Sequence, residues 1–215
     1  MRSLLPLFVL GFALPALADY DAFAIPQKGD ATVEVLGGWR ATPQHPFFSQ
    51  LQRDGLNPQH SAFQPEGVLS LGFAADTDFH VTIDVSYGLD SWQTSAGTAQ
   101  VSMVGILLGA DTPLYTNPYF TLYAGGGLGY SLNTFTSAGQ NTESNSSSGF
   151  LRAGVRVRLG NRIALVVEDR YVVSSALWPA FSSTVNVGGN LLSVGFLVHF
   201  FSPEDAGHPQ EPTTH

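Results

Sequence analysis

The sequence contains no cysteine, little charge and, beyond its first residues, no long apolar run. Without cysteine, a secreted module held together by disulfides is excluded. Charged residues make up 12% of the chain, about half the fraction usual in soluble domains. Yet no stretch after residue 18 approaches the roughly 18 apolar residues that a transmembrane helix requires. Low charge without such a helix favours a protein that crosses the bilayer as β-strands.

Cations are also scarce. Lys28 is the only lysine, and the formal net charge is −8. The sequence therefore offers no basic patch that could follow a phosphate backbone, which argues against nucleic-acid binding.

The first 18 residues have the pattern of a secretory signal peptide. Arg2 supplies the positive start, Leu4 to Leu14 form the apolar core, and Ala16-Leu17-Ala18 is a small-x-small cleavage site. Because the apolar core is too short to span a bilayer as a helix, an uncleaved anchor is the weaker alternative. We expect the mature protein to begin near Asp19.

The rest of the chain alternates between apolar and polar residues with a period of two, which is typical of β-strands. The clearest alternation covers residues 79–89. Eight such segments are predicted, over residues 31–40, 67–75, 79–89, 98–110, 119–133, 149–159, 162–173 and 188–201. The fourth begins in alternation and then loses it. The last presents one apolar, lipid-facing side, formed by Leu192, Val194, Phe196, Val198 and Phe200.

The connections are short at one end and mostly longer at the other, where they span residues 41–66, 90–97, 134–148 and 174–187. This arrangement, with an even number of strands, describes an outer-membrane barrel whose termini both lie in the periplasm. The sequence therefore predicts an all-β fold, an eight-stranded antiparallel up-and-down transmembrane β-barrel with a filled interior. A soluble β-sandwich is the alternative, because alternation alone does not distinguish a protein core from lipid.

Several charged residues fall on the inward face of the predicted strands. They are Glu34, Asp84, Arg152, Arg156, Glu168 and Arg170, with Arg158 near the periplasmic mouth. Since side chains fill an eight-stranded barrel, these charges should pair in a structural network; a narrow ion path is the alternative. Asp169 then faces lipid unless a β-bulge turns it aside. Gly125, Gly127 and Gly129 should leave room for the arginines of the next strand.

The sequence shows no sign of catalysis. It has neither a Gly-x-Ser-x-Gly elbow nor a His-Glu-x-x-His metal motif. His80 and His199 belong to the periplasmic end, and His45 and His60 to the first loop, where nothing nearby completes a metal site. The sequence therefore predicts a non-enzymatic protein without metal or cofactor. A lipid A-modifying hydrolase is the alternative.

The long loops and the C-terminal segment carry the remaining predictions. Exposed aromatics can act as binding anchors, and the candidate loop contacts are Phe47, Phe48, Trp178 and Phe181. Residues 137–149 are rich in Ser, Asn and Gly and should form a mobile loop. Residues 202–215 are polar and rich in proline, so we expect a disordered periplasmic tail.

Residues 118–130, residues 167–171 and the aromatic final strand, together with the signal peptide, resemble the eight-stranded outer-membrane β-barrel family of OmpA-type and OmpX-type proteins and opacity adhesins. The likeness covers about residues 19–201. It implies a Gram-negative outer membrane, lipid and lipopolysaccharide neighbours, and insertion by the assembly machinery that reads the last strand. It further implies a role in envelope integrity or in surface interaction through the loops, with a ligand that the sequence does not identify. The 14-residue tail departs from the usual ending on an aromatic.

Overall fold

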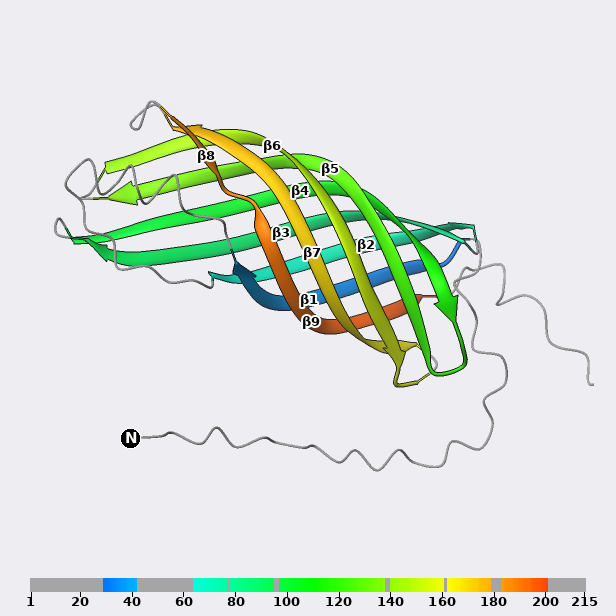
Figure 1. The fold of residues 1–215 in the computed structure, drawn as a ribbon. Helices are drawn as coiled ribbons and strands as arrows, with labels where there is room; N and C mark the ends of the chain where they lie inside the picture. The colour runs from blue at the N-terminus through cyan, green and yellow to red at the C-terminus, as the bar shows by residue number, and fades with distance from the viewer. Residues whose placement is uncertain are drawn as a thin grey trace, which may run out of the picture.

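The computed structural model describes residues 29–41, 64–76, 78–94, 97–137, 140–160, 162–178 and 183–200. These segments form strands β1 (Ala31–Ala41), β2 (Gln64–Asp76), β3 (Phe79–Thr94), β4 (Gly97–Thr116), β5 (Phe120–Ser137), β6 (Gln140–Arg158), β7 (Ile163–Trp178), β8 (Ser183–Asn186) and β9 (Gly189–Phe200) (Figure 1). None of the described residues form a helix that is long and apolar enough to cross a membrane. The predicted signal peptide (1–18) and tail (202–215) lie outside the described residues, as do His45 and His60.

Eight of the strands close into a ring. Each pairs antiparallel with its neighbour in sequence from β1 to β7, and β9 closes the ring by pairing with both β7 and β1. The short strand β8 continues the line of β9 towards the loop end, where it adds four backbone pairs to β7 in the same register as β9. The predicted eight-stranded antiparallel barrel is therefore confirmed, while β8 lies in a segment that was expected to be loop.

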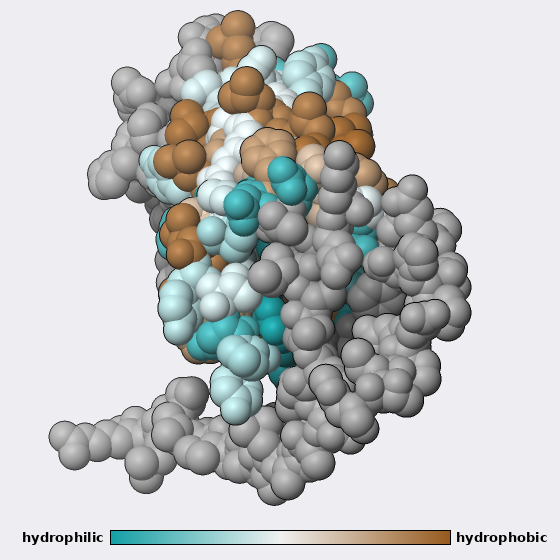
Figure 2. Space-filling view, turned by 90° about the vertical axis from the view of Figure 1, so that its right-hand side faces the viewer, coloured by the Kyte–Doolittle hydropathy of each residue, from teal (hydrophilic) through white to brown (hydrophobic). Residues whose placement is uncertain are grey.

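The strands present an apolar outside and a mixed inside. In β1, Thr32, Glu34 and Leu36 are buried, whereas Val35 and Trp39 are 57% and 64% exposed. The same alternation exposes large apolar side chains on every strand of the ring, far more than a soluble protein usually presents to water. Figure 2 looks at the end that carries the short turns, and shows hydrophobic side chains gathered on the flank and hydrophilic ones towards the opening. This outer surface suits lipid.

Exposed aromatic side chains form two rows around the barrel, as the girdles of outer-membrane barrels do. At the end with the short turns, called the turn end here, the row consists of Phe73, Phe79, Tyr115, Tyr119 and Phe200. Towards the opposite end, the loop end, it consists of Trp39, Tyr87, Tyr130 and Tyr171. The apolar band between these girdles marks the part of the barrel that crosses the membrane.

Five strands continue well past the loop-end girdle, whereas β1, β2 and β9 stop near it (Figure 1). We call this extension the wall; it comprises residues 88–94, 97–103, 131–137, 140–146 and 172–178. The expectation of a mobile loop over residues 137–149 is therefore wrong, because β6 begins at Gln140 and turns Ser144, Ser146 and Ser148 inward. The predicted loops at 90–97 and 174–187 are likewise largely strand.

The fourth strand keeps its alternation as far as Asp111, contrary to the sequence-based expectation. Met103, Leu107 and Asp111 are all buried, and Ile106 and Leu108 between them are exposed. Leu107 packs with Phe150 and Val172 in a small apolar cluster inside the barrel. The interior of β4 is thus partly apolar, which hides the alternation in the sequence.

Candidate functional site

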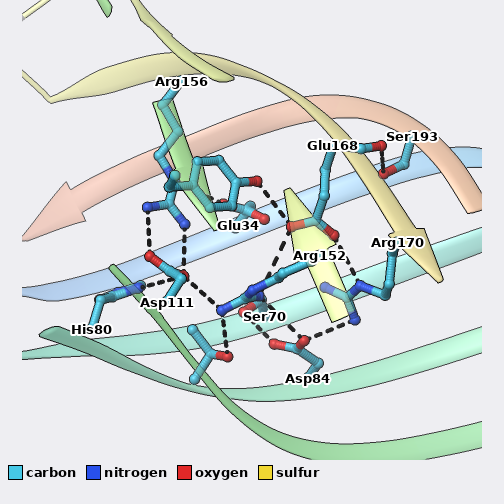
Figure 3. Close-up of polar contacts among 12 residues, drawn as sticks. Glu34, Ser70, His80, Asp84, Asp111, Arg152, Arg156, Glu168, Arg170 and Ser193 are labelled. Carbon is cyan, nitrogen blue, oxygen red and sulfur yellow. Dashed lines mark hydrogen bonds and ion pairs between the residues drawn. The ribbon is translucent and has the colours of Figure 1, made fainter. Parts of the chain in front are cut away.

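The interior of the barrel holds a cluster of ion pairs, which we call the lumen network (Figure 3). The structure places all six predicted lumen residues on the inward face and brings them together with a seventh, Asp111. The network therefore consists of Glu34, Asp84, Asp111, Glu168, Arg152, Arg156 and Arg170. Strict inward parity on β1, β3, β4, β6 and β7 is what makes these side chains converge.

Arg152 is the centre of the lumen network. Its guanidinium lies 2.6 Å from Asp111, 3.5 Å from Asp84 and 3.9 Å from Glu168, and its side chain is fully buried. It also donates a 3.0 Å hydrogen bond to the hydroxyl of Thr82. One cation thus balances carboxylates from three different strands, so it ties β6 to β3, β4 and β7 across the lumen.

Arg156 occupies the half of the network nearer the turn end. Its two terminal nitrogens donate to the two Asp111 oxygens at 3.0 and 3.1 Å, a bidentate pair. Its Nε lies 3.6 Å from Glu34, and its guanidinium stacks 3.9 Å from the centre of the Tyr123 ring. Glu34 has no other ion pair among the described residues, and its Oε1 has no hydrogen-bond partner there.

Arg170 completes the network towards the loop end. Its Nε donates to Glu168 at 2.9 Å, and its Nη1 lies 2.8 Å from Asp84. Asp84 also accepts a 2.6 Å hydrogen bond from Ser70. The guanidinium lies 4.8 Å from the centre of the Phe150 ring. Phe150 belongs to an apolar cluster, so the lumen network ends here and apolar packing begins.

The glycines that were expected to leave room for arginines have other neighbours. A Cβ on Gly125 would lie 2.7 Å from the Asp111 side chain, and one on Gly129 would lie 2.5 Å from Leu107, whereas Gly127 makes room for an aromatic ring. A Cβ on Gly127 would lie 2.7 Å from Phe150, and one on Gly109 would lie 2.6 Å from the same ring. A Cβ on Gly154 would meet the Tyr123 hydroxyl at 2.6 Å. Packed rings and paired charges together fill the lumen, as an interior of this size allows.

One contact set has the order of a nucleophile, base and acid. The Thr32 hydroxyl lies 2.8 Å from His80 Nε2, and His80 Nδ1 lies 3.3 Å from Asp111. All three side chains are buried, and two arginines already engage the Asp111 carboxylate. Because the three side chains are buried and the Asp111 carboxylate is already paired with two cations, we interpret the contacts as structural. Nor do the described residues contain a group of three or more His, Cys, Asp and Glu side chains placed to hold a metal.

A second polar region lies inside the wall and in the adjoining part of the barrel, and its residues were not among those predicted from the sequence. Arg40 forms a 2.5 Å ion pair with Glu66 and donates to the Val187 carbonyl at 3.0 Å. The backbone ladder between β6 and β7 ends at Ser148 and Ser174 among the described residues, and serine hydroxyls bridge the two strands beyond it. Ser146 and Ser174 share a 2.8 Å hydrogen bond, for example. The inward parity of Glu34 and Leu36 extends to Arg40 and could have revealed that residue.

The structure places the remaining predicted residues as follows. On the closing strand, Leu192, Val194, Phe196 and Phe200 are exposed on the outer face, and Val198 is partly covered there. Trp178 is the last residue of β7 and so belongs to a strand. Phe47, Phe48 and Phe181 lie outside the described residues.

Asp169 faces outward, and no bulge turns it aside. It pairs with Ala153 of β6 and Leu192 of β9 in registers that run without interruption. It lies two residues from Tyr171 of the loop-end girdle, on the side facing the apolar band. The suggested bulge is therefore wrong, and a carboxylate sits on the lipid-facing surface.

Replacing Asp169 with leucine should raise the free energy of unfolding in phospholipid vesicles by about 1–2 kcal/mol, because a lipid-facing acid costs less than the roughly 2–4 kcal/mol of a cation at the midplane. Urea titration of the vesicle-inserted protein would measure the change. Glu143→Leu, on the wall outside the apolar band, is the matched control and should change stability by less than about 0.5 kcal/mol. A loss of stability in Asp169→Leu would mean that this carboxylate has a partner in the membrane.

An eight-stranded ring that is apolar outside and filled with paired charges inside defines a transmembrane β-barrel with a closed lumen. Residues 5–200 match the model of the outer membrane protein beta-barrel domain, so the chain belongs to this family of outer-membrane proteins.

Solved structures agree with this assignment. Neisserial surface protein A matches with 17% identity and a TM-score of 0.57, over 80% of this chain and 98% of that one. OprG from Pseudomonas aeruginosa matches with 11% identity and a TM-score of 0.52, over 82% and 98%. Ail of Yersinia pestis, in complex with the heparin analogue sucrose octasulfate, matches with 13% identity and a TM-score of 0.51, over 81% and 100%. No curated protein matches the chain in sequence.

Proposed function

We propose that this protein is a non-enzymatic outer-membrane barrel that mediates surface interaction through its wall, with the turn end and both termini in the periplasm. The observation that carries the proposal is the length of β3 to β7, which extends a polar sheet beyond the loop-end girdle. The lumen network also supports this proposal, because a barrel whose interior is filled with ion pairs is better suited to be a rigid support for the wall than a channel.

The outward face of the wall carries a cluster of mostly uncharged hydrogen-bonding groups on β4, β5 and β6. Gln100 pairs across strands with Thr136, and Thr136 with Asn141. Next to them, Ser102 pairs with Thr134 and Thr134 with Glu143. Hydroxyl and amide groups held on a sheet form a preorganised surface for a polar partner.

The composition of the wall also narrows the chemistry of that partner. Its described residues include no lysine or arginine, and the acids among them are Asp90 and Glu143. The structure of Ail was determined with a polyanion, the heparin analogue sucrose octasulfate. A surface without cations suits neutral polar groups, such as the hydroxyls of a saccharide, better than sulfates or phosphates.

A short-wall variant tests the proposal. Thr134 and Glu143 face each other across the β5–β6 hairpin, so residues 135–142 can be replaced by an Asn-Gly turn that rejoins the strands in register. Bacteria carrying this variant should lose attachment to one another and to epithelial monolayers, down to the level of a deletion strain. Their resistance to detergents should stay at the level of the intact protein, because the barrel and its lumen network remain.

Heat-modifiable migration on gels provides the control for assembly. If the short-wall variant fails to assemble, the substitutions Thr134→Ala, Thr136→Ala and Asn141→Ala remove the polar groups and keep the hairpin. Unchanged attachment in an assembled variant would contradict the proposal. Unchanged attachment with detergent sensitivity as high as in the deletion strain would instead assign the protein to envelope integrity.

A further inference from the structure

One strand of the wall has a backbone edge that no described strand pairs with. Along β6, residues 140–157 all pair with β5, but the pairing with β7 begins only at Ser148. The second edge of residues 140–147, which we call the free edge, therefore has no partner among the described strands. Tyr130 of the loop-end girdle is the register partner of Ser147. The free edge thus begins at this girdle and extends beyond the apolar band.

The backbone groups of every second residue point out of the free edge. At the other end of β6, the Arg158 N–H donates towards β5, to the Tyr119 carbonyl. The next residue, Leu159, donates its N–H towards β7, to the Ile163 carbonyl. These directions alternate along an antiparallel strand, and the register of β6 with β5 is uninterrupted. The residues that present N–H and C=O groups to the free edge are therefore Asn141, Glu143, Asn145 and Ser147.

β7 does not close the free edge. Continuing the register of β6 with β7 would pair Asn145 with Leu177. Instead, the Ser144 hydroxyl donates a 2.6 Å hydrogen bond to the Leu177 carbonyl, in the place where the Asn145 N–H would donate. Residues 140–143 extend past the register partner of Trp178, the last residue of β7. A strand added here would displace the Ser144 contact and gain a ladder of backbone hydrogen bonds.

The free edge lacks the features by which proteins usually prevent strand addition. Natural edge strands carry lysine, proline or a bulge for this purpose. Residues 140–147 contain neither lysine nor proline, and their register with β5 shows no shift. Their one charged side chain, Glu143, faces outward. At roughly 3.4 Å per residue, the free edge is about 27 Å long, which suits a strand of ordinary length.

We propose that the free edge binds an extended segment of a partner protein, which adds to β6 as a further strand. An extended polypeptide has the same alternation of N–H and C=O groups, so main-chain hydrogen bonds supply the affinity, whereas a saccharide or a lipid has no such repeat. A cation of that segment opposite Glu143 would add a favourable cross-strand pair. The inference goes beyond the proposed function, which rests on the outer face of the wall, so either can fail without the other.

A second copy of this chain fits the free edge less well. Two barrels in one membrane have the same orientation, so their β6 strands could pair only in parallel, which is slightly less stable than antiparallel pairing. Two-fold symmetry would also bring the two Glu143 carboxylates towards each other, and like charges on neighbouring strands are destabilising. We therefore expect a different protein as the partner.

Fluorescence anisotropy with the full-length protein in non-ionic detergent tests the proposal. The probe is a labelled peptide with the sequence of residues 130–137, which already pairs with residues 140–147 along their other edge. Asn145→Pro removes an N–H from the free edge and keeps the β5 ladder, because this N–H points away from β5. It should weaken binding of the peptide about tenfold. Asn145→Ala, the matched control, removes the same side chain but keeps the N–H, and should bind as the intact protein does.

Two modified probes test the same contact without changing the protein. One carries backbone N-methyl groups at its odd positions and the other at its even positions, so each lacks the N–H groups of one edge. One of them should bind as the unmodified peptide does, and the other should lose binding, because only one edge of the peptide faces β6.

Three results would overturn the proposal. The first is a lack of binding between the unmodified probe and the intact protein. The second is an equal effect of both methylated probes, or equal losses in Asn145→Pro and Asn145→Ala variants that show heat-modifiable migration, since recognition would then not use the backbone. The third is a dimer of the intact protein in native mass spectrometry that Asn145→Pro abolishes, which would assign the free edge to a second copy.

Discussion

Replacing Arg152 with methionine should lower the free energy of unfolding in phospholipid vesicles by about 3–5 kcal/mol, the usual cost of removing one partner from a buried ion pair. Arg152 faces Asp84, Asp111 and Glu168 in the fully buried centre of the lumen network. Methionine is similar in length but leaves these carboxylates without their shared cation. Urea titration, followed by heat-modifiable migration, would measure the change.

Glu34→Gln is the matched control inside the same network. The network contains four carboxylates and three guanidiniums, and Glu34 contributes a single 3.6 Å ion pair. Arg156 keeps its bidentate pair with Asp111 when Glu34 is neutral. We therefore expect Glu34→Gln to cost about 1 kcal/mol or less, the value of one modest polar contact.

A second substitution sharpens the test. Asp84→Asn in the Arg152→Met background removes one of the stranded negative charges, so the double variant should be more stable than Arg152→Met alone. Arg170 still has Glu168 at 2.9 Å in that variant. Equal stability of intact protein and Arg152→Met would show that the ion pairs do not hold the lumen together.

The sequence predicts this fold well where a strand meets lipid on one side and a polar lumen on the other. In β3, for example, exposed Ile83 and Val85 flank buried Asp84, so the alternation is visible in the sequence itself. The same parity led to the six lumen residues that the structure brings together. A strand with lipid on one face and a polar lumen on the other has apolar and polar residues in alternation, and this pattern can be recognised in the sequence.

The prediction fails where both faces have the same character. In the wall, outward Glu143 and Asn145 alternate with inward Ser144 and Ser146, so strand and loop have the same polar composition. For this reason the composition of these extensions predicts loops. No local pattern could reveal that serine hydroxyls bridge β6 and β7 in the wall. This contact arises because the backbone pairing of these two strands ends at Ser148 and Ser174, which is a property of the tertiary structure.

Asp111 illustrates a third kind of failure. The predicted fourth strand ended at residue 110, so this carboxylate fell into a turn, although it is the residue that joins Arg152 to Arg156. An acid beside Thr112 and Pro113 resembles turn composition. In the structure, β4 continues to Thr116, and a register shift between Pro113 and Tyr115 accommodates the proline.

Two neighbouring leucines of β4 offer the second large effect. Leu107→Ala should lower the free energy of unfolding by about 3–5 kcal/mol, the upper part of the range for buried leucine. Leu107 is 4% exposed and packs with Phe150 and Val172. Across from it, Gly129 has no side chain that could move into the cavity. The cavity should therefore persist, and urea titration in vesicles would measure its cost.

Leu108→Ala makes the same chemical change on the lipid-facing side, where this residue is 61% exposed. Lipid tails close over the missing methyl groups, so only the transfer free energy is lost, about 2 kcal/mol at most. Leu107→Ala should thus cost clearly more than Leu108→Ala. A larger cost for Leu108→Ala would mean that Leu108 faces the lumen and Leu107 faces lipid. Asp111 lies four residues beyond Leu107 on the same face of β4, so it would then face lipid as well. Comparing the stability of these two leucine variants therefore also tests whether Asp111 lies in the lumen, where it joins Arg152 to Arg156.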